Sequence, residues 1–477
     1  MLVASIAMVT VVAVTARNTV APEAAVFSNV ATPWMPAVPL PGGLTSTWFC
    51  PGVPAAGAEG TGGSVRVFNT GEATMGGRIT VLAAAGEPVI QALSVPAFAM
   101  SEFDLDALVD SPYAAAFVEI DGGGGIVEQL AIDPAGHSVT ACANTPSDEW
   151  YLATGDTVGD SVGFLVLSNP NDDAAIVDIT LSTSAGIRTP QSLQNYPVPA
   201  RSVRVVDVNN AGRDEETDIG VSVVASRGNV VVGRAQTYAS EARRGYVMSL
   251  AAPTLRDQWF FAYGRKGGGA STTYSVYNPN DTDVDVIPVP LGFSPGDDYL
   301  TPETFEVPAG EVRVFSLGDI AGIPDGLVSF VLSTTDAELR VVVERVITQT
   351  IEDRPTTSVE FGATYRPVDN YMANTWYVGA GVDVAAPGSL RLFNMDAAAA
   401  VVTVQAVTPT GVVNVESLAA VDLPENGALT IDLTDDLTLQ GYPLIIRSTS
   451  RLLVERVMPR EPGAQGQVSV WAFPANA

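Results

Sequence analysis

The amino-acid sequence predicts an all-β fold: four tandem Ig-like antiparallel β-sandwich domains that follow an apolar N-terminal segment. Three observations support this fold class. Short apolar runs with alternating polar residues are bounded by Gly, Pro, Asn and Asp, as strands and turns are. No long stretch carries the apolar stripe of an amphipathic helix. Four short motifs recur four times in one order, in units of about 100 residues, the size of an Ig-like sandwich.

The composition excludes several classes of protein. The chain has 477 residues, of which 47% are hydrophobic and 16% charged, so it has material for several cores and is not disordered throughout. Its net charge of −29 repels phosphate backbones and anionic lipid headgroups, and we expect no nucleic-acid partner. One histidine and two cysteines leave little material for metal sites, histidine-dependent triads or thiol catalysis. We therefore expect no cofactor, no metal site and no catalytic residue.

Residues 1–17 contain an uncharged apolar run that is too short to cross a full bilayer as a helix. The run ends in small residues that resemble a signal-peptidase site, but no Lys or Arg precedes it. The segment is therefore either a signal peptide or a membrane anchor, and the third interpretation is a buried strand or helix of a cytosolic protein. Residues 18–43 are rich in Pro and Ala and predict an extended linker. We expect contact with a membrane only through the N-terminal segment.

Each predicted domain opens with a tryptophan that is followed by a second aromatic residue, and a short apolar run ending in asparagine comes next. In the two middle copies this asparagine begins the motif Asn-Pro-Asn-Asp. We interpret that motif as a hairpin turn, because Pro fixes φ and Asn and Asp side chains bond their own backbone. The repeat-defining residues at these two stations are Trp48, Trp150, Trp259, Trp376, Asn69, Asn169, Asn278 and Asn394.

Two further motifs complete each unit. Val-Pro-Ala or a close variant precedes an alternating segment, and a pair of strands joined by a polar turn follows. In the second strand of that pair the repeats carry Gln129 and the repeat-defining arginines Arg234, Arg345 and Arg456 at one station. Glu344 precedes Arg345 inside an apolar strand, and Glu455 precedes Arg456. Strand alternation turns one member of each pair inward or toward a junction, so we predict salt bridges to a neighbouring domain.

The repeats place four β-sandwich domains at residues 44–146, 147–254, 255–367 and 368–477. The junctions between them are short and contain proline, which favours a semi-rigid, elongated rod. Each domain is expected to bury its own core, so fragments of two domains should fold.

These motifs resemble the repeats of DUF5719, a family of uncharacterised secreted proteins from actinobacteria and related phyla. The matching segments are 150–155, 169–171, 198–202 and 343–345, and the resemblance extends over all four domains. The first domain departs from the pattern, with Cys50 where the second has Leu152, and the fourth has Met395 in place of the proline. The resemblance implies an exported, Ig-like β protein and implies no activity.

Cys50 and Cys142 occupy positions near the start and the end of the first domain. The other domains place apolar residues there, such as Leu152 and Leu250, so both cysteines are expected to be core neighbours. A disulfide between them would fit an oxidising compartment and would contribute roughly 4–5 kcal/mol by the chain-entropy estimate. The alternative is two buried free thiols in a cytosolic protein.

Several other groups have a chemical and a structural interpretation. His137 lies in a turn-like segment with no converging partners, and we interpret it as an exposed turn residue. The glycine run 122–125 lacks the lysine of a phosphate-binding loop and is interpreted as a flexible hairpin turn. Acidic pairs could bind Ca²⁺ or form solvated turns, and none has the spacing of a calcium loop. These pairs are Asp172 and Asp173, Asp297 and Asp298, and Asp435 and Asp436.

We expect a non-enzymatic, exported structural or adhesive protein of the cell envelope or the extracellular space. Its expected partners are other cell-surface proteins or glycans. One alternative is an array of glycan-binding modules, which requires that the four tryptophans be exposed for stacking rather than packed in the core. The second alternative is a hydrolase with an unrecognised carboxylate site, which requires two facing acids in a cleft. The exposure of the tryptophans separates a scaffold from a lectin.

Overall fold

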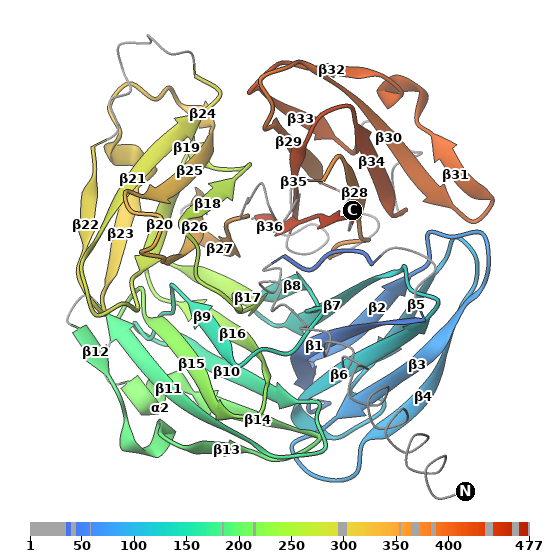
Figure 1. Ribbon diagram of the computed structural model, residues 1–477, viewed down its shortest axis with the longest axis vertical. Helices are drawn as coiled ribbons and strands as arrows, with labels where there is room; N and C mark the ends of the chain where they lie inside the picture. The colour runs from blue at the N-terminus through green and yellow to red at the C-terminus, as the bar shows by residue number, and fades with distance from the viewer. Residues whose placement is uncertain are drawn as a thin grey trace, which may run out of the picture. The chain divides into compact units, whose positions relative to one another are not determined.

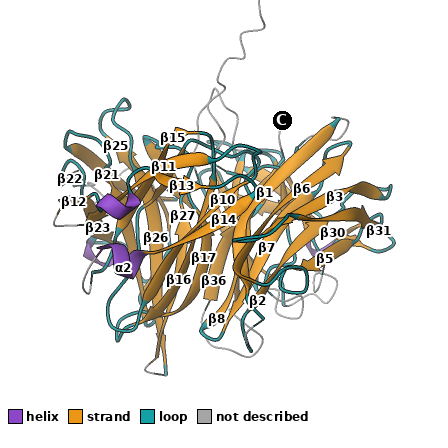
Figure 2. Cartoon of the chain, turned by 90° about the horizontal axis from the view of Figure 1, so that it is seen from below, coloured by secondary structure: helices purple, strands orange, loops and turns teal. Residues whose placement is uncertain are grey.

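The computed structural model describes residues 35–39, 44–57, 59–183, 186–212, 216–293, 303–352, 354–363, 373–382, 388–434, 442–459 and 467–475. The expected signal peptide or anchor at residues 1–17 lies outside the described residues, as do Asp297, Asp298, Asp435 and Asp436. Strands dominate the described part of the chain, and the short helix α2 (Val208–Gly212) is one of its few helical segments (Figure 2). The predicted all-β fold is confirmed.

The first repeat shows the topology that the other three share. Its strands are β1 (Thr45–Ala55), β2 (Gly62–Phe68), β3 (Met75–Leu82), β4 (Val89–Val95), β5 (Met100–Asp104), β6 (Ser111–Asp121), β7 (Ile126–Asp133) and β8 (Gly136–Ala141). One antiparallel sheet has the order β1-β6-β3-β4, and we call it the peripheral sheet. The other has the order β5-β2-β7-β8, and we call it the axial sheet. Each sheet turns its apolar residues toward the other, so the core lies between them.

The second repeat repeats this arrangement, with a peripheral sheet β9-β15-β11-β12, in which β13 also pairs with β11, and an axial sheet β14-β10-β16-β17. Its elements are β9 (Glu149–Leu152), β10 (Val162–Asn169), β11 (Ala175–Thr183), β12 (Gly186–Arg188), the 3-10 helix η1 (Gln191–Leu193), β13 (Tyr196–Val198), β14 (Ser202–Asp207), α2, β15 (Gly220–Arg227), β16 (Val231–Ala239) and β17 (Arg244–Leu250).

The third repeat has a peripheral sheet β18-β25-β21-β22, an axial sheet β23-β20-β26-β27 and a small extra sheet of β19 and β24. Its elements are β18 (Gln258–Phe261), β19 (Arg265–Lys266), β20 (Ala270–Tyr277), β21 (Val284–Leu291), β22 (Phe305–Val307), β23 (Val312–Ser316), the 3-10 helix η2 (Leu317–Asp319), β24 (Gly326–Leu327), β25 (Ser329–Thr334), β26 (Val342–Ile351) and β27 (Arg354–Phe361).

The fourth repeat has a peripheral sheet β31-β30-β34-β28-β37, in which β32 also pairs with β30, and an axial sheet β33-β29-β35-β36. Its elements are β28 (Thr375–Val378), β29 (Ser389–Asn394), β30 (Ala400–Thr408), β31 (Gly411–Asn414), the 3-10 helix η3 (Glu416–Leu418), β32 (Val421–Leu423), β33 (Ala428–Asp432), β34 (Leu444–Ser448), β35 (Leu452–Pro459), β36 (Gln467–Trp471) and β37 (Phe473–Pro474).

The four repeats close into a ring instead of forming a rod. Strands β8, β17, β27 and β36, which we call the axial strands, lie together in the middle of Figure 1. Strand β8 contacts β17, β17 contacts β27, β27 contacts β36, and β36 contacts β8 again. Residues 33–477 accordingly form one compact unit. The expected elongated rod is therefore wrong, because each axial strand is a sheet edge that packs against the edges of the two neighbouring repeats.

Polar and apolar contacts both join the axial strands. The Ser138 hydroxyl donates to the Met248 carbonyl at 3.1 Å and accepts from the Met248 amide at 2.9 Å, and the Trp471 indole donates to the Phe361 carbonyl at 2.7 Å. Separate apolar clusters bridge the repeats. One joins Val139 of β8 to Val468 of β36. Serine and tryptophan side chains thus satisfy edge backbone groups that a free sheet edge leaves unpaired.

The chain enters and leaves the ring at the same place. Residues 35–39, the last part of the expected linker, lie against the fourth repeat: the Val38 amide donates to the Pro474 carbonyl at 2.9 Å, and Val38 pairs in parallel with Ala475. Met35 and Val38 are buried. This pairing ties the first described residues to the last ones and adds to the contact between the fourth and the first repeat.

The connections that we expected to be hairpin turns cross between the two sheets instead. The Asn-Pro-Asn-Asp segment joins β10 of the axial sheet to β11 of the peripheral sheet. Likewise, the glycine run 122–125 joins β6 of the peripheral sheet to β7 of the axial sheet, and all four of its residues have positive φ. The expected strand pairs therefore do not pair with each other, because a short polar turn serves an arch between sheets as well as a hairpin.

Candidate binding site at the ring axis

The four opening tryptophans are core residues of the peripheral sheets. Trp48, Trp150, Trp259 and Trp376 are each at most 1% exposed. The indole of Trp150 donates to the Val230 carbonyl at 2.9 Å, and that of Trp259 donates to the Val341 carbonyl at 2.9 Å. The four side chains therefore have no face free to stack on a sugar, and Trp150 and Trp259 also hold the residue that precedes β16 and β26, respectively.

The four asparagines act as buried clamps. The side-chain amide of Asn169 donates to the carbonyls of Asp173 at 2.8 Å and Val198 at 3.1 Å, and its oxygen accepts from the Asn171 amide at 3.0 Å. Asn69, Asn278 and Asn394 make the same three kinds of contact in their own repeats. Each asparagine thus holds the arch that follows it and anchors that arch to the Val-Pro motif.

Cys50 and Cys142 form a disulfide, as the sequence predicts. Both are buried, and the bond joins the peripheral strand β1 to the residue that follows the axial strand β8. The equivalent of Cys142 in the second repeat is Ala251, one residue beyond the expected Leu250, because the amides of Cys142 and Ala251 donate to equivalent carbonyls on β7 and β16. The disulfide favours an oxidising environment.

The predicted salt bridges between neighbouring domains are present, and they are buried. Arg234 on β16 holds Glu344 on β26 through two bonds, Nη2 to Oε1 at 2.8 Å and Nη1 to Oε2 at 3.0 Å. The side chains are 3% and 0% exposed. Glu344 also accepts hydrogen bonds from the backbone amides of Ala153 and Thr154 at 2.8 and 2.7 Å. The carboxylate of the third repeat thus pairs with two backbone N–H groups of the second repeat.

The same contact recurs one repeat further on. Arg345 donates to both oxygens of Glu455, and Nη1 lies 3.1 Å from Oε2. Glu455 also accepts from the Tyr263 amide at 3.0 Å, which is the counterpart of the Thr154 contact. At the closing junction Arg456 lies in the electrostatic field of Glu128, which belongs to the first repeat. Three of the four junctions therefore place an arginine of one repeat against a glutamate of the next.

The junction between the first and the second repeat lacks both charges. Gln129 stands at the arginine station and exchanges two hydrogen bonds of 3.3 Å with Gly52 of its own repeat. Gly233 stands at the glutamate station, where a Cβ atom would meet Pro51 at 2.8 Å. Since a buried charge without its partner is costly, both members of the pair are replaced together.

Burial and pairing act in opposite directions on these groups. Burial opposes the charge on Arg234 and Arg345, but their glutamate partners outweigh it, and the pKa of each arginine lies above its usual value. At the closing junction burial prevails. It lowers the pKa of Arg456 to about 10 and raises the pKa of Glu128, although Arg66 and Arg456 partly offset the latter shift.

A small cavity of about 40 Å³ lies where the axial strands end. All four axial strands or the residues just after them contribute to its lining, together with Met35 and Pro36. Glu360 is the one charged residue among the described residues that line it. Burial and, next, the nearby Glu455 raise the pKa of Glu360 to about 8. This end of the axis therefore leaves little room for a ligand, and burial favours the neutral form of its carboxyl group.

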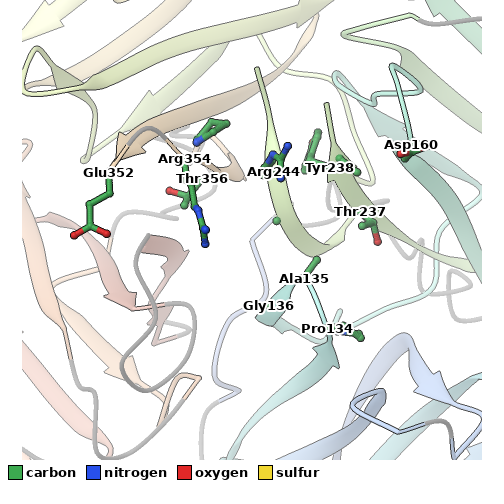
Figure 3. Close-up of a pocket in the computed structure, with 13 residues that line it drawn as sticks. Pro134, Ala135, Gly136, Asp160, Thr237, Tyr238, Arg244, Glu352, Arg354 and Thr356 are labelled. Atoms are coloured by element: carbon green, nitrogen blue, oxygen red, sulfur yellow. The ribbon is translucent and has the colours of Figure 1, made fainter. Parts of the chain in front are cut away.

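The opposite end of the axial strands opens into a cavity of about 740 Å³, which we call the hairpin mouth (Figure 3). Its lining comes from the segments that precede β8, β10 and β27, the end of β16 and the first residues of β8, β17 and β27. Four charged residues contribute, Asp160, Arg244, Glu352 and Arg354, and all four are exposed. The volume falls within the usual range of ligand sites, about 300–1,000 Å³. The hairpin mouth is the strongest candidate for a binding site in the described part of the chain.

The two arginines of the hairpin mouth differ from those of the junctions. The side chains of Arg244 and Arg354 make no hydrogen bond or ion pair to any part of the chain that the structure describes. In Figure 3 they lie toward the middle of the pocket, while Glu352 and Asp160 lie at its two sides. The site is not evident in the sequence, because its residues come from three different repeats. One signal in the sequence points to it: the last strands of the second and the third repeat, β17 and β27, both begin with arginine.

The other sequence candidates do not converge on a site. His137 is a half-buried residue of β8 and not an exposed turn residue, because β8 already begins at Gly136. Asp172 is exposed and pairs with Arg201. Among the described residues no group of three His, Cys, Asp or Glu side chains could hold a metal ion. No helix of the described chain is long and apolar enough to cross a membrane.

Comparison with known proteins gives a family and no activity. The model of a family of unknown function, DUF5719, matches residues 128–364, which confirms the resemblance for the end of the first repeat and for the second and third repeats. The match runs from the Glu128 station of the first repeat to the end of the third. It thus spans both the uncharged junction and the Arg234–Glu344 junction. A search of the curated proteins found no match.

Two solved structures show weak similarity. The crystal structure of Thermotoga maritima 1070 is 18% identical, with a TM-score of 0.19, over 23% of this chain and 94% of that one. A tetra-tandem repeat in the extending region of a large adhesion protein is 15% identical, with a TM-score of 0.11, over 85% of this chain and 93% of that one. At these TM-scores neither structure informs the fold or the function of this chain.

Proposed function

We propose that this protein is a non-enzymatic, exported structural or adhesive protein of the cell envelope or the extracellular space. The observation that carries the proposal is the use of the repeated side chains. The tryptophans and asparagines are buried, and so are the arginine–glutamate pairs that join the second, third and fourth repeats. Side chains that are buried and hydrogen-bonded within the fold are not available for catalysis. The disulfide fits an oxidising location.

In this proposal the ring is a rigid support and the hairpin mouth is the surface that meets a partner, which is another surface protein or a glycan. Turns on a rigid scaffold are common sites of recognition. Residues 35–39 lie against the fourth repeat, and Met35 and Pro36 line the small cavity at the other end of the axial strands. The hairpin mouth therefore lies at the end of the axis away from the entry of the chain.

Two measurements on the full chain test the proposal. In cells that produce the protein, an externally added protease should cleave it, and Cys50 and Cys142 should resist thiol alkylation until they are reduced. Purified protein should also sediment with isolated envelopes and release no soluble fragments from them. A cytosolic protein with alkylatable cysteines, or one that degrades envelope polymers, contradicts the proposal.

A further inference from the structure

We infer that the hairpin mouth binds an oxyanion, a carboxylate or phosphate group of its ligand, between Arg244 and Arg354. This inference rests on the proposed function, and it specifies the chemical group of the partner that the hairpin mouth would bind. The argument begins with register. Arg244 is the first residue of β17 and pairs with Ala239, and Arg354 is the first residue of β27 and pairs with Ile351. Both arginines thus begin an axial strand, although they differ by one residue in register, because the Ala239–Arg244 pair corresponds to Thr350–Pro355.

The packing of the ring places these two strand starts on neighbouring axial strands, since β17 contacts β27. Both side chains line one cavity. Like charges on neighbouring strands destabilise a fold unless an opposite charge compensates them. The other two axial strands, β8 and β36, begin with Gly136 and Gln467, so an axial strand does not require arginine at its start.

The two arginines lack an acidic partner although the chain as a whole is strongly acidic. Acidic residues number 53 against 24 basic ones, so carboxylates are abundant. Nevertheless, neither arginine pairs with a described carboxylate, and Glu352 and Asp160 lie at the sides of the pocket and not between the arginines (Figure 3). Other exposed arginines of the same chain do form pairs, such as Arg78 with Glu119. Two guanidinium groups without such a partner leave their donors free for a ligand.

The chemistry of the guanidinium group selects the ligand. Its planar fork of N–H donors matches the two oxygens of a carboxylate or a phosphate, and such paired bonds are among the strong ones. A cavity of about 740 Å³ accommodates a ligand larger than a single ion. A neutral sugar lacks the charge that would compensate the two arginines, so we expect it to bind much more weakly.

The test is titration calorimetry of the full chain with citrate as the carboxylate probe and pyrophosphate as the phosphate probe. We expect one or both to bind at low ionic strength. Removal of each arginine should weaken binding about tenfold, so R244A/R354A should show no heat at the same concentrations. The matched control is R227A/R447A, which removes two exposed arginines elsewhere and should bind as the wild type does. R244K/R354K keeps the charge and should recover only part of the affinity.

The outcomes separate the sources of the oxyanion and the two proposals. Binding of citrate alone identifies carboxylates, and binding of pyrophosphate alone identifies phosphates. The inference is overturned if neither probe binds to the wild type. It is also overturned if R244A/R354A binds as well as the wild type, or if R227A/R447A loses as much affinity as R244A/R354A. An R244A/R354A protein with an unchanged thermal midpoint excludes unfolding as the cause of a loss. Oxyanion binding without envelope sedimentation would overturn the proposed function and leave this site in place.

Discussion

The Arg234–Glu344 pair should be among the most sensitive points of the ring. The variant E344Q keeps an oxygen that can accept from the amides of Ala153 and Thr154 but removes the negative charge. Arg234 then remains buried, at 3% exposure, with the Thr154 carbonyl and the Ser249 hydroxyl as its neutral partners. Removing one member of a buried ion pair costs about 3–5 kcal/mol, because the remaining charge has no compensation.

The double variant R234Q/E344Q tests the physical reason for that loss. With both charges gone, the junction resembles the natural uncharged junction at Gln129 and Gly233, and no buried charge is left alone. We therefore expect the double variant to be destabilised by much less than the sum of the two single variants, with a coupling energy of about 2–3 kcal/mol.

Urea titration of the four proteins, followed by intrinsic fluorescence, gives the free energies of unfolding. The matched control is E119Q, which breaks the pair between Glu119 and the 59% exposed Arg78 and should cost less than about 1 kcal/mol. The reasoning is refuted if E344Q costs no more than E119Q, or if the effects of R234Q and E344Q are additive.

Three further predictions concern the core and the axis. The pKa of Glu360 is about 8 in the folded protein and 4.5 ordinarily, so folding favours the protonated form. The free energy of unfolding should therefore fall as the pH rises from about 5 to about 8. Urea titrations at several pH values should show a weaker pH dependence of this free energy for E360Q than for the wild type. If E360Q showed the same pH dependence as the wild type, a group other than Glu360 would be responsible for it. The variant C50S/C142S should lose up to about 4–5 kcal/mol, measured against the oxidised wild type in urea; an equal midpoint would mean that the bond does not form. Replacing Asn169 by alanine leaves buried carbonyls without donors and should cost about 1–3 kcal/mol for each group, whereas the exposed control N210A should cost little; equal losses would contradict the clamp.

Local features of this fold could be predicted from the sequence because they depend on residues within one repeat. Alternation predicted the strands, and the equivalence of Cys50 with Leu152 predicted that the cysteine lies in the core. The arches could not be told from hairpins, since a short turn of Asn, Pro and Gly suits both connections. The Asn169 side chain contains the missing information, because a buried amide that bonds the distant Val198 carbonyl belongs to a crossing between sheets.

Closure of the ring depends on contacts between repeats, which no local pattern encodes. The sequence does contain one signal of a contact between repeats. The arginine and glutamate stations change together, to Gln129 and Gly233, as members of a buried pair should. The hairpin mouth could not be predicted either, because Arg244 and Arg354 belong to different repeats and become neighbours only through the ring.

Small-angle X-ray scattering of the full chain tests the central claim, the closure of the four repeats into a ring, most directly. A compact chain of this length has a radius of gyration of about 23 Å, and we expect a value close to it. Four sandwiches placed end to end would give about 40 Å. A value near the larger figure, unchanged by salt and by protein concentration, would contradict the contact between β36 and β8.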